Sequence, residues 1–240
     1  MLKIENLTKI FGSYTAVNNL NLEIQGGELF GFLGPNGAGK TTTIKMMVGL
    51  YSPSAGSIYY DGTKISASPL DVKKQIGYIP DQPYIYDKLT GKEFLYFSGG
   101  LFNLPKQKIK NQIEELVELL KIGDWLNKRT EEYSQGMKQR ITFASAFLHN
   151  PQFIIIDEPM IGLDPQSAHI VKNVLKEKAK EGKTIFMSTH SLNVAEEICS
   201  RVSIINKGEM IFDDNIDTLH KMKNEMKRNF EELFIELTQD

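Results

Sequence analysis

The chain has 240 residues, of which 41% are hydrophobic, and this length is sufficient for one large domain with a buried core. Its 28 lysine and arginine residues against 30 aspartate and glutamate residues give a formal net charge of −2, so it lacks the basic excess that duplex nucleic acid binding usually requires. The single cysteine, Cys199, excludes an intrachain disulfide, and its apolar neighbours predict a buried, inert thiol.

Short strands are predicted in the first 80 residues. They cover residues 2–4, 16–24, 28–33, 57–60 and 74–79, with glycine-containing turns between them. The strand at 28–33 ends at a glycine-rich loop, and residues 40–50 then read as a helix. The N-terminal segment lacks the apolar central run of a signal peptide, and we expect no secretion signal there. Because no stretch of 18 or more apolar residues occurs, we also expect no membrane-spanning helix.

The pattern becomes helical over residues 84–150. Pro105 can begin a helix, because apolar residues follow it at helical spacing. A second helix is predicted over residues 134–148, before Asn150 and Pro151.

Strands and helices alternate in the last third of the chain. Strands are predicted at 153–156, 184–188 and 202–205, and helices at 165–180 and 192–199. This order predicts a parallel sheet with helices on both faces, interrupted by an inserted helical lobe. In the charged tail, 214–240, four apolar residues follow helical spacing: Phe230, Leu233, Phe234 and Leu237. We expect this stripe to pack against the body, with a partner-binding surface as the alternative.

The strongest motif is GPNGAGKT, residues 34–41, which matches G-x-x-x-x-G-K-[ST] between a strand and a helix. Its glycines let backbone N–H groups point at phosphate oxygens, and the following helix adds its positive end. The motif therefore predicts binding of a nucleoside triphosphate, most simply ATP with Mg²⁺. The expected contacts come from Gly34, Asn36, Gly37, Ala38, Gly39, Lys40, Thr41 and Thr42, with Lys40 on the β- and γ-phosphates and the Thr41 hydroxyl on the metal.

Two further segments contain residues suited to catalysis or to anion binding. In IIIDEP, residues 154–159, a buried strand ends in Asp157, suited to the Mg²⁺ shell, and Glu158, suited to accept a proton from the attacking water. By themselves these acids could instead cap the next helix. In YSQGMKQR, residues 133–140, Ser134 and Gly136 begin a helix, and such an end favours an anion or is an ordinary N-cap.

These motifs occur in one order with IGLDP at 161–165 and Ser188-Thr189-His190, and together they resemble the ATP-binding cassette (ABC) ATPases from about residue 1 to 213. The resemblance implies a RecA-like P-loop core with a mostly parallel sheet, an N-terminal antiparallel β subdomain and an inserted helical subdomain. The core and β subdomain would comprise 1–83 and 151–213, and the helical subdomain 84–150.

In that family two cassettes pair head to tail, and each ATP lies between the phosphate loop of one and the signature helix of the other. The resemblance assigns Ser134, Gln135 and Gly136 to the γ-phosphate bound by the partner, and Asp164 to a loop that communicates between the sites. It assigns His190 to the γ-phosphate and the attacking water. Phe11 matches the place of an adenine-stacking ring, with core packing as the alternative.

The sequence departs from the family pattern at two places. The usual signature LSGGQ is altered by Tyr133, Gln135 and Met137, although Ser134 and Gly136 remain. The usual glutamine after the strand is replaced in GYIPDQP by Asp81, followed by Gln82, and either could contact Mg²⁺ or the water.

Both departures resemble the branch that serves bacterial exporters with separate permease chains. The resemblance implies a homodimeric ATPase held on the cytoplasmic face of the membrane by a permease, which would dock near Tyr84, Ile85 and Tyr86. Exposed aromatics would suit docking, but the default expectation is that one or both tyrosines are buried. A cassette acting on nucleic acid or another protein is the alternative function. The net charge and the lack of long insertions or a second cassette do not favour it.

Overall fold

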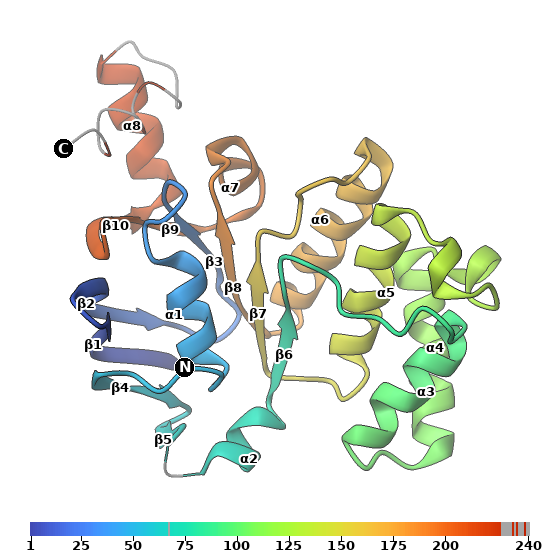
Figure 1. The fold of residues 1–240 in the computed structure, drawn as a ribbon. Helices are drawn as coiled ribbons and strands as arrows, with labels where there is room; N and C mark the ends of the chain where they lie inside the picture. Colours follow the sequence, from blue (N-terminus) through green and yellow to red (C-terminus); the bar gives the residue numbers. More distant parts are fainter. Residues whose placement is uncertain (67, 227–231, 233, 235–237, 239–240) are drawn as a thin grey trace.

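Two sheets organise the computed structural model, which describes residues 1–66, 68–226, 232, 234 and 238 (Figure 1). The smaller sheet is antiparallel, in the order β2-β1-β4-β5. Its strands are β1 (Leu2–Phe11), β2 (Tyr14–Ile24), β4 (Ala55–Tyr60) and β5 (Thr63–Lys64). The predicted strand at 2–4 is therefore the start of a ten-residue strand. Bulges shift its register and bend it around the core.

The larger sheet has the order β10-β9-β3-β8-β7-β6 and is parallel except at its β9-β10 edge. Its strands are β3 (Leu29–Leu33), β6 (Ile76–Ile79), β7 (Phe153–Asp157), β8 (Thr184–Thr189), β9 (Arg201–Asn206) and β10 (Glu209–Asn215). Sequence patterning missed β10, because this edge strand alternates only between exposed and half-buried residues. The fold class predicted from the sequence is confirmed.

Helices cover the sheet and form the inserted lobe (Figure 1). They are α1 (Lys40–Met47), α2 (Pro69–Lys73), α3 (Gly91–Leu101), α4 (Lys106–Leu120), α5 (Gln135–Phe147), α6 (Pro165–Lys180), α7 (Leu192–Ile198) and α8 (Ile216–Met226), with short 3₁₀ turns at Gly123–Trp125 and Thr130–Glu132. The helix predicted to reach residue 50 ends at Met47, where Gly49 turns the chain with φ +69°. Pro105 precedes α4, as predicted.

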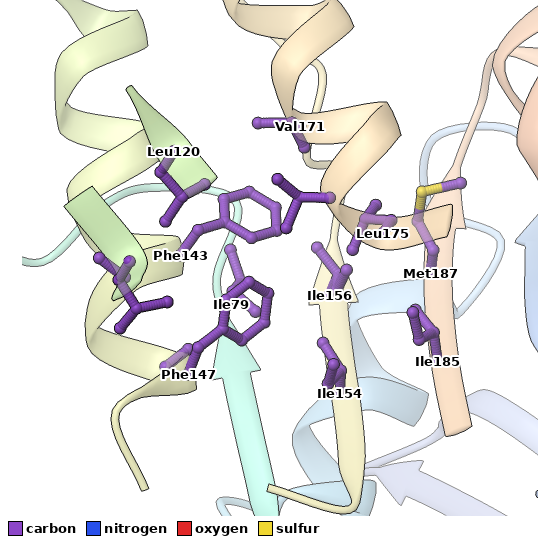
Figure 2. Close-up of a cluster of buried hydrophobic side chains, with 14 of the residues drawn as sticks. Ile79, Leu120, Phe143, Phe147, Ile154, Ile156, Val171, Leu175, Ile185 and Met187 are labelled. Atoms are coloured by element: carbon purple, nitrogen blue, oxygen red, sulfur yellow. The ribbon is translucent and has the colours of Figure 1, made fainter. Parts of the chain in front are cut away.

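Alternate side chains of the central strands point into two separate cores. On β7, Ile154 and Ile156 face the lobe, whereas Phe153 and Ile155 face the antiparallel sheet. Figure 2 shows the first core, which Phe143 and Phe147 of α5 share with Ile79 of β6 and with Ile154 and Ile156 of β7. The lobe and the sheet therefore share one hydrophobic core.

Cys199 is buried as predicted, and burial raises the pKa of its thiol. In the tail, Phe234 packs half-buried against the lobe-side core, while Phe230, Leu233 and Leu237 lie outside the described residues. Within the described part of the chain, no helix is both long and apolar enough to cross a membrane.

Candidate functional site: a phosphate loop and a buried carboxylate pair

The loop between β3 and α1 can be built only with glycine at two positions. A Cβ on Gly34 would lie 2.4 Å from the Ile205 carbonyl oxygen. A Cβ on Gly39 would lie 2.5 Å from the Ala16 carbonyl oxygen, and Gly39 also has φ +112°. The backbones of β2 and β9 therefore pack directly against the loop and restrict its conformation. The loop lines an open cavity of about 380 Å³.

The cavity gathers most of the predicted phosphate-loop residues. Its walls are Tyr14, Ala16, Asn36, Gly37, Ala38, Gly39, Lys40, Thr41, Thr42, Asp81, Glu158 and Ile161. Tyr14 and Ala16 were not predicted, because nothing in a linear motif indicates that the first hairpin folds against the loop. Ile161 had appeared only as the start of the IGLDP segment, without a predicted role.

Lys40 is buried at the base of the loop, with 6% of its surface exposed. Its Nζ donates hydrogen bonds to the carbonyl oxygens of Gly34 (2.7 Å) and Pro35 (3.2 Å), and lies 3.4 Å from Glu158 Oε1. A buried ammonium group needs such oxygens around it. Phosphate oxygens in the cavity can replace the carboxylate at little cost, since they carry the same sign of charge.

Asp157 and Glu158 do not cap the next helix, because Asp164 caps α6, and the alternative of a capping role is wrong. Asp157 is fully buried. Its Oδ1 accepts a 2.5 Å hydrogen bond from Ser188 Oγ, while its Oδ2 has no partner among the described residues. Burial raises the pKa of Asp157 against the opposing hydrogen bond from Ser188, and the nearby charges of Asp81 and Glu158 raise it further.

This arrangement fits a divalent cation such as Mg²⁺. An unpartnered buried carboxylate oxygen, the Thr41 hydroxyl and the nearby Asp81 offer the oxygen ligands that Mg²⁺ prefers. The described residues contain no cluster of three or more His, Cys, Asp or Glu side chains suited to a metal. A cation here would therefore complete its shell with phosphate oxygens and water.

Glu158 is held in a left-handed backbone conformation, with φ +49°, which is uncommon for a residue other than glycine. Its N–H donates to the Ser188 carbonyl oxygen (3.2 Å) and hydroxyl (3.1 Å). Its Oε2 lies 3.0 Å from His190 Nδ1 and accepts from the His190 N–H at 3.3 Å. The carboxylate thus bridges Lys40 and His190. Ser188, quoted in the sequence analysis only as part of a motif, organises both acids.

The structure bears on two questions that the sequence left open: whether Asp81 or Gln82 contacts the metal or the water, and whether Phe11 packs in the core. Asp81 lines the cavity and Gln82 does not, which favours Asp81 as the metal or water contact. Phe11 is 44% exposed, so its core-packing alternative is wrong. Phe11 packs edge-on against Tyr51 and lies outside the cavity wall.

The residues assigned to the signature helix and to the communicating loop form a second cluster that is not on the cavity wall. Ser134 caps α5 by accepting a 3.3 Å hydrogen bond from the Met137 N–H, so its oxygen is engaged while its hydroxyl hydrogen can still donate. A Cβ on Gly136 would lie 2.8 Å from Asp164 Oδ2 and 2.6 Å from Ser167 Oγ. Gln135 Cγ would lie 3.3 Å from a Cβ on Gly162. The starts of α5 and α6 are therefore in direct contact.

The departure from the signature pattern at Tyr133 has a packing reason. The ring is buried edge-on against Trp125, and its hydroxyl donates to the Trp125 carbonyl oxygen at 3.0 Å. The same hydroxyl would be 2.2 Å from a Cβ on Gly91, so the first residue of α3 must be small. The tyrosine ties the start of α5 to the start of α3.

The fold and the phosphate loop define a P-loop ATPase. Residues 17–161 match the ABC transporter family. The bacitracin transport ATP-binding protein BcrA of Bacillus licheniformis is 37% identical over 92% of this chain and 72% of its own length. The ABC transporter ATP-binding protein all4389 of Nostoc sp. (strain PCC 7120) is 37% identical over 87% of this chain, which spans 62% of that relative's length.

Solved structures agree with this assignment. An ATP-binding subunit of an ABC transporter superposes with a TM-score of 0.89, 30% identity and 99% coverage of both chains. A dimeric post-hydrolysis cassette, MJ0796 bound to ADP and Pi, superposes with a TM-score of 0.81 and 26% identity over 90% of this chain and 99% of its own. The chain belongs to the family of ABC transporter ATP-binding proteins, and it is an ATP-binding ABC ATPase.

Proposed function

We propose that this chain is the ATPase subunit of an exporter whose membrane permease is a separate chain. It would act as a homodimer, with Mg²⁺ and ATP, on the cytoplasmic face of the membrane. Transport is supported by the printed function of a relative, bacitracin transport, and export is supported by the sequence departures already described.

The position of the α5 N-terminus is the observation that best supports a dimer. The cavity is lined by the phosphate loop, Lys40 and Glu158, but the N-terminus of α5, which favours an anion, does not line it. A second copy placed head to tail would bring Ser134, Gln135 and Gly136 against the γ-phosphate. Each ATP would then be a bridge contacted from two chains, and its hydrolysis would release them.

Within one cavity, the residues divide the work of hydrolysis. Lys40 would leave Glu158 and contact the β- and γ-phosphates, which frees the Glu158 carboxylate to accept a proton from the attacking water. His190 would hold that carboxylate in position and contact the γ-phosphate. Thr41, Asp157 and Asp81 would hold Mg²⁺, which when bound neutralises phosphate charge.

The helical subdomain, 84–150, would transmit dimer closure to the permease. A groove of about 250 Å³ lies between the sheet and this lobe, and Tyr84 lines it with 78% of its surface exposed. Tyr86 is 57% exposed and Ile85 is half-buried against the core, so the expected burial of the two tyrosines is wrong. Exposed aromatics are enriched at protein interfaces.

The test uses Glu158→Gln, alone and combined with Ser134→Arg. We expect Glu158→Gln to bind ATP, to lose at least about 100-fold in turnover and to accumulate as an ATP-bound dimer in analytical ultracentrifugation. Adding Ser134→Arg should abolish that dimer while the ATP affinity of the monomer stays within about twofold of the single variant.

Near-normal turnover in Glu158→Gln would contradict the role of Glu158. A dimer that survives Ser134→Arg would contradict the two-chain site. Copurification of the unmodified chain from membranes would identify its permease, and ATP-dependent transport by the reconstituted pair tests the coupling itself.

A further inference from the structure

Ser188 lies near the end of β8, directly opposite Asp157 of β7 in the parallel pair that the two strands form. Residues paired in this way point to the same face of a sheet, so the serine hydroxyl and the aspartate carboxylate meet. Both residues are fully buried. The proposed function gives a role to Asp157 and to its neighbour Glu158, but none to Ser188.

The Ser188 hydroxyl contacts both acids at once. Its Oγ donates a hydrogen bond to Asp157 Oδ1 at 2.5 Å and accepts one from the Glu158 N–H at 3.1 Å. A hydroxyl has a single hydrogen to donate, so the bond to Asp157 uses that hydrogen and leaves the oxygen lone pairs for the N–H. One side chain therefore holds the carboxylate of the first acid and the backbone of the second.

The two contacts differ in what would remain without the hydroxyl. The Glu158 N–H would keep its bond to the Ser188 carbonyl oxygen, at 3.2 Å, and with it part of the support for its left-handed backbone. The Asp157 carboxylate would lose its bond at Oδ1, while Oδ2 already has no partner among the described residues. The larger consequence is therefore expected at Asp157.

We propose that Ser188 is a positioning residue, which orients the Asp157 carboxylate so that its unpartnered oxygen is available to the divalent cation. The inference rests on the proposed function and deepens it, because it assigns the orientation of a metal-binding side chain to a hydroxyl on the neighbouring strand. Without that hydroxyl the carboxylate is free to rotate, and cation binding then has to fix its orientation at a cost in affinity.

The test measures Mn²⁺, a paramagnetic probe for Mg²⁺, binding to the full-length chain with ADP by electron paramagnetic resonance. We expect Ser188→Ala to weaken Mn²⁺ binding by about tenfold, whereas ADP binding without divalent cations should stay within about twofold of the unmodified chain. The Mg²⁺ concentration that gives half-maximal ATPase activity should rise in parallel with the loss of Mn²⁺ affinity.

Ser188→Thr and Ser188→Val are a matched pair, because the two side chains have nearly the same shape and only threonine has a hydroxyl. Threonine should keep the Mn²⁺ affinity within about threefold, and valine should weaken it as much as alanine does. Ser203→Ala is the control for a merely structural effect. Ser203 is also fully buried and donates to an aspartate, Asp213, at 2.8 Å, but neither residue lines the cavity, so the Mn²⁺ affinity should not change.

An unchanged Mn²⁺ affinity in Ser188→Ala and Ser188→Val would overturn the proposal, as would equal losses in the threonine and valine variants. Asp157→Asn should itself weaken Mn²⁺ binding, and adding Ser188→Ala should weaken it little further, because the serine acts through this carboxylate. A full additional loss in the double variant would show that Ser188 acts elsewhere. If the unmodified chain with ADP binds no Mn²⁺, the proposed metal site itself fails, whatever the Ser188 variants do.

Discussion

Asp157 is a buried carboxylate with one oxygen satisfied and one without a partner among the described residues. Burial is the largest cause of its raised pKa, which means that the charged form is disfavoured in the chain by itself. The charge therefore costs stability at neutral pH in the nucleotide-free chain. Under the proposed function the same charge holds Mg²⁺, so the requirements of stability and of function conflict at Asp157.

Asp157→Asn should stabilise the nucleotide-free chain by on the order of 1 kcal/mol, because the amide removes the buried charge and can still accept from Ser188. The same variant should lose most Mg²⁺-dependent ATPase activity. Urea unfolding in the absence of nucleotide measures the first effect, and a phosphate-release assay the second.

Asp213→Asn is the matched control, because Asp213 is ion-paired with Arg201 and accepts a hydrogen bond from Ser203. The same chemical change there should lower stability. A loss of stability in both variants would contradict the account of Asp157.

At the scale of residues, linear motifs predicted the phosphate loop and both acids, but not the neighbours that come from distant strands. Ser188 binds both Asp157 and Glu158 across the sheet, 31 and 30 residues away along the chain. Tyr14 reaches the cavity because the first hairpin folds onto the loop. Both contacts depend on which strands lie side by side in the sheets, and strand order cannot be derived from any single motif.

At the scale of elements, the starts of α5 and α6 form one packed unit. Each is capped by its own side chain, Ser134 for α5 and Asp164 for α6. Hydrogen bonds from Ser167 lower the pKa of Asp164, so they stabilise the charged form of the cap. Gly136 sits against the Asp164–Ser167 pair without space for a side chain. A shift in one helix start must therefore move the other.

Gly136→Ala should disturb this contact by pushing its methyl group into Ser167 Oγ and Asp164 Oδ2. We expect ATPase activity to fall by at least about tenfold, because in the proposed dimer the displaced helix start would no longer meet the γ-phosphate bound by the partner chain, while the ADP affinity of the monomer stays unchanged.

Gly100→Ala is the matched control, because a Cβ at this exposed position of α3 meets nothing within 4 Å. It should keep full activity and gain up to about 1 kcal/mol in stability, since alanine favours a helix. Equal activity in the two alanine variants would contradict the coupling of the two helix starts.

The elements themselves were largely predictable where apolar periodicity was strong. Helix α6 and strand β8 begin where the pattern places them. Helix α3 was predicted only as part of a helical region, although Thr90 and Glu93 form a capping box at its start. A capping pattern is short, and it becomes informative only when the helix boundary is already known.

At the scale of the whole molecule, His149 joins the lobe to the sheet. Its ring stacks on Phe102 at 3.8 Å, and its Nε2 lies 3.0 Å from the Ile76 carbonyl oxygen of β6. Burial lowers the pKa of His149 to about 4 from its ordinary 6.5. The folded chain therefore holds this histidine neutral over a range in which the unfolded chain protonates it.

Because the folded-state pKa is the lower one, the stability that depends on neutral His149 is complete above pH 6.5 and is lost as the pH falls toward 4. The loss should reach about 2 kcal/mol near pH 5. His149→Phe, which retains an aromatic ring against Phe102, should remove this part of the acid sensitivity. Urea unfolding at about pH 7 and about pH 5 measures the difference.

His169→Gln, which removes an exposed histidine of α6, should leave the pH dependence unchanged. An identical acid loss in the unmodified chain and in His149→Phe would contradict the assignment to His149.

The shared core described in Figure 2 limits how this protein can be recombined with its relatives. A chimera that exchanges only helices α3–α5 would carry Phe143 and Phe147 without the sheet residues of the same core, among them Ile79, Ile154 and Ile156. Mismatched volumes there would create cavities or clashes, and leucine- or phenylalanine-sized gaps cost roughly 2–5 kcal/mol. Any specificity that the lobe carries could thus be transferred only together with the sheet residues of the shared core, and evolution by exchange of the lobe faces the same restriction.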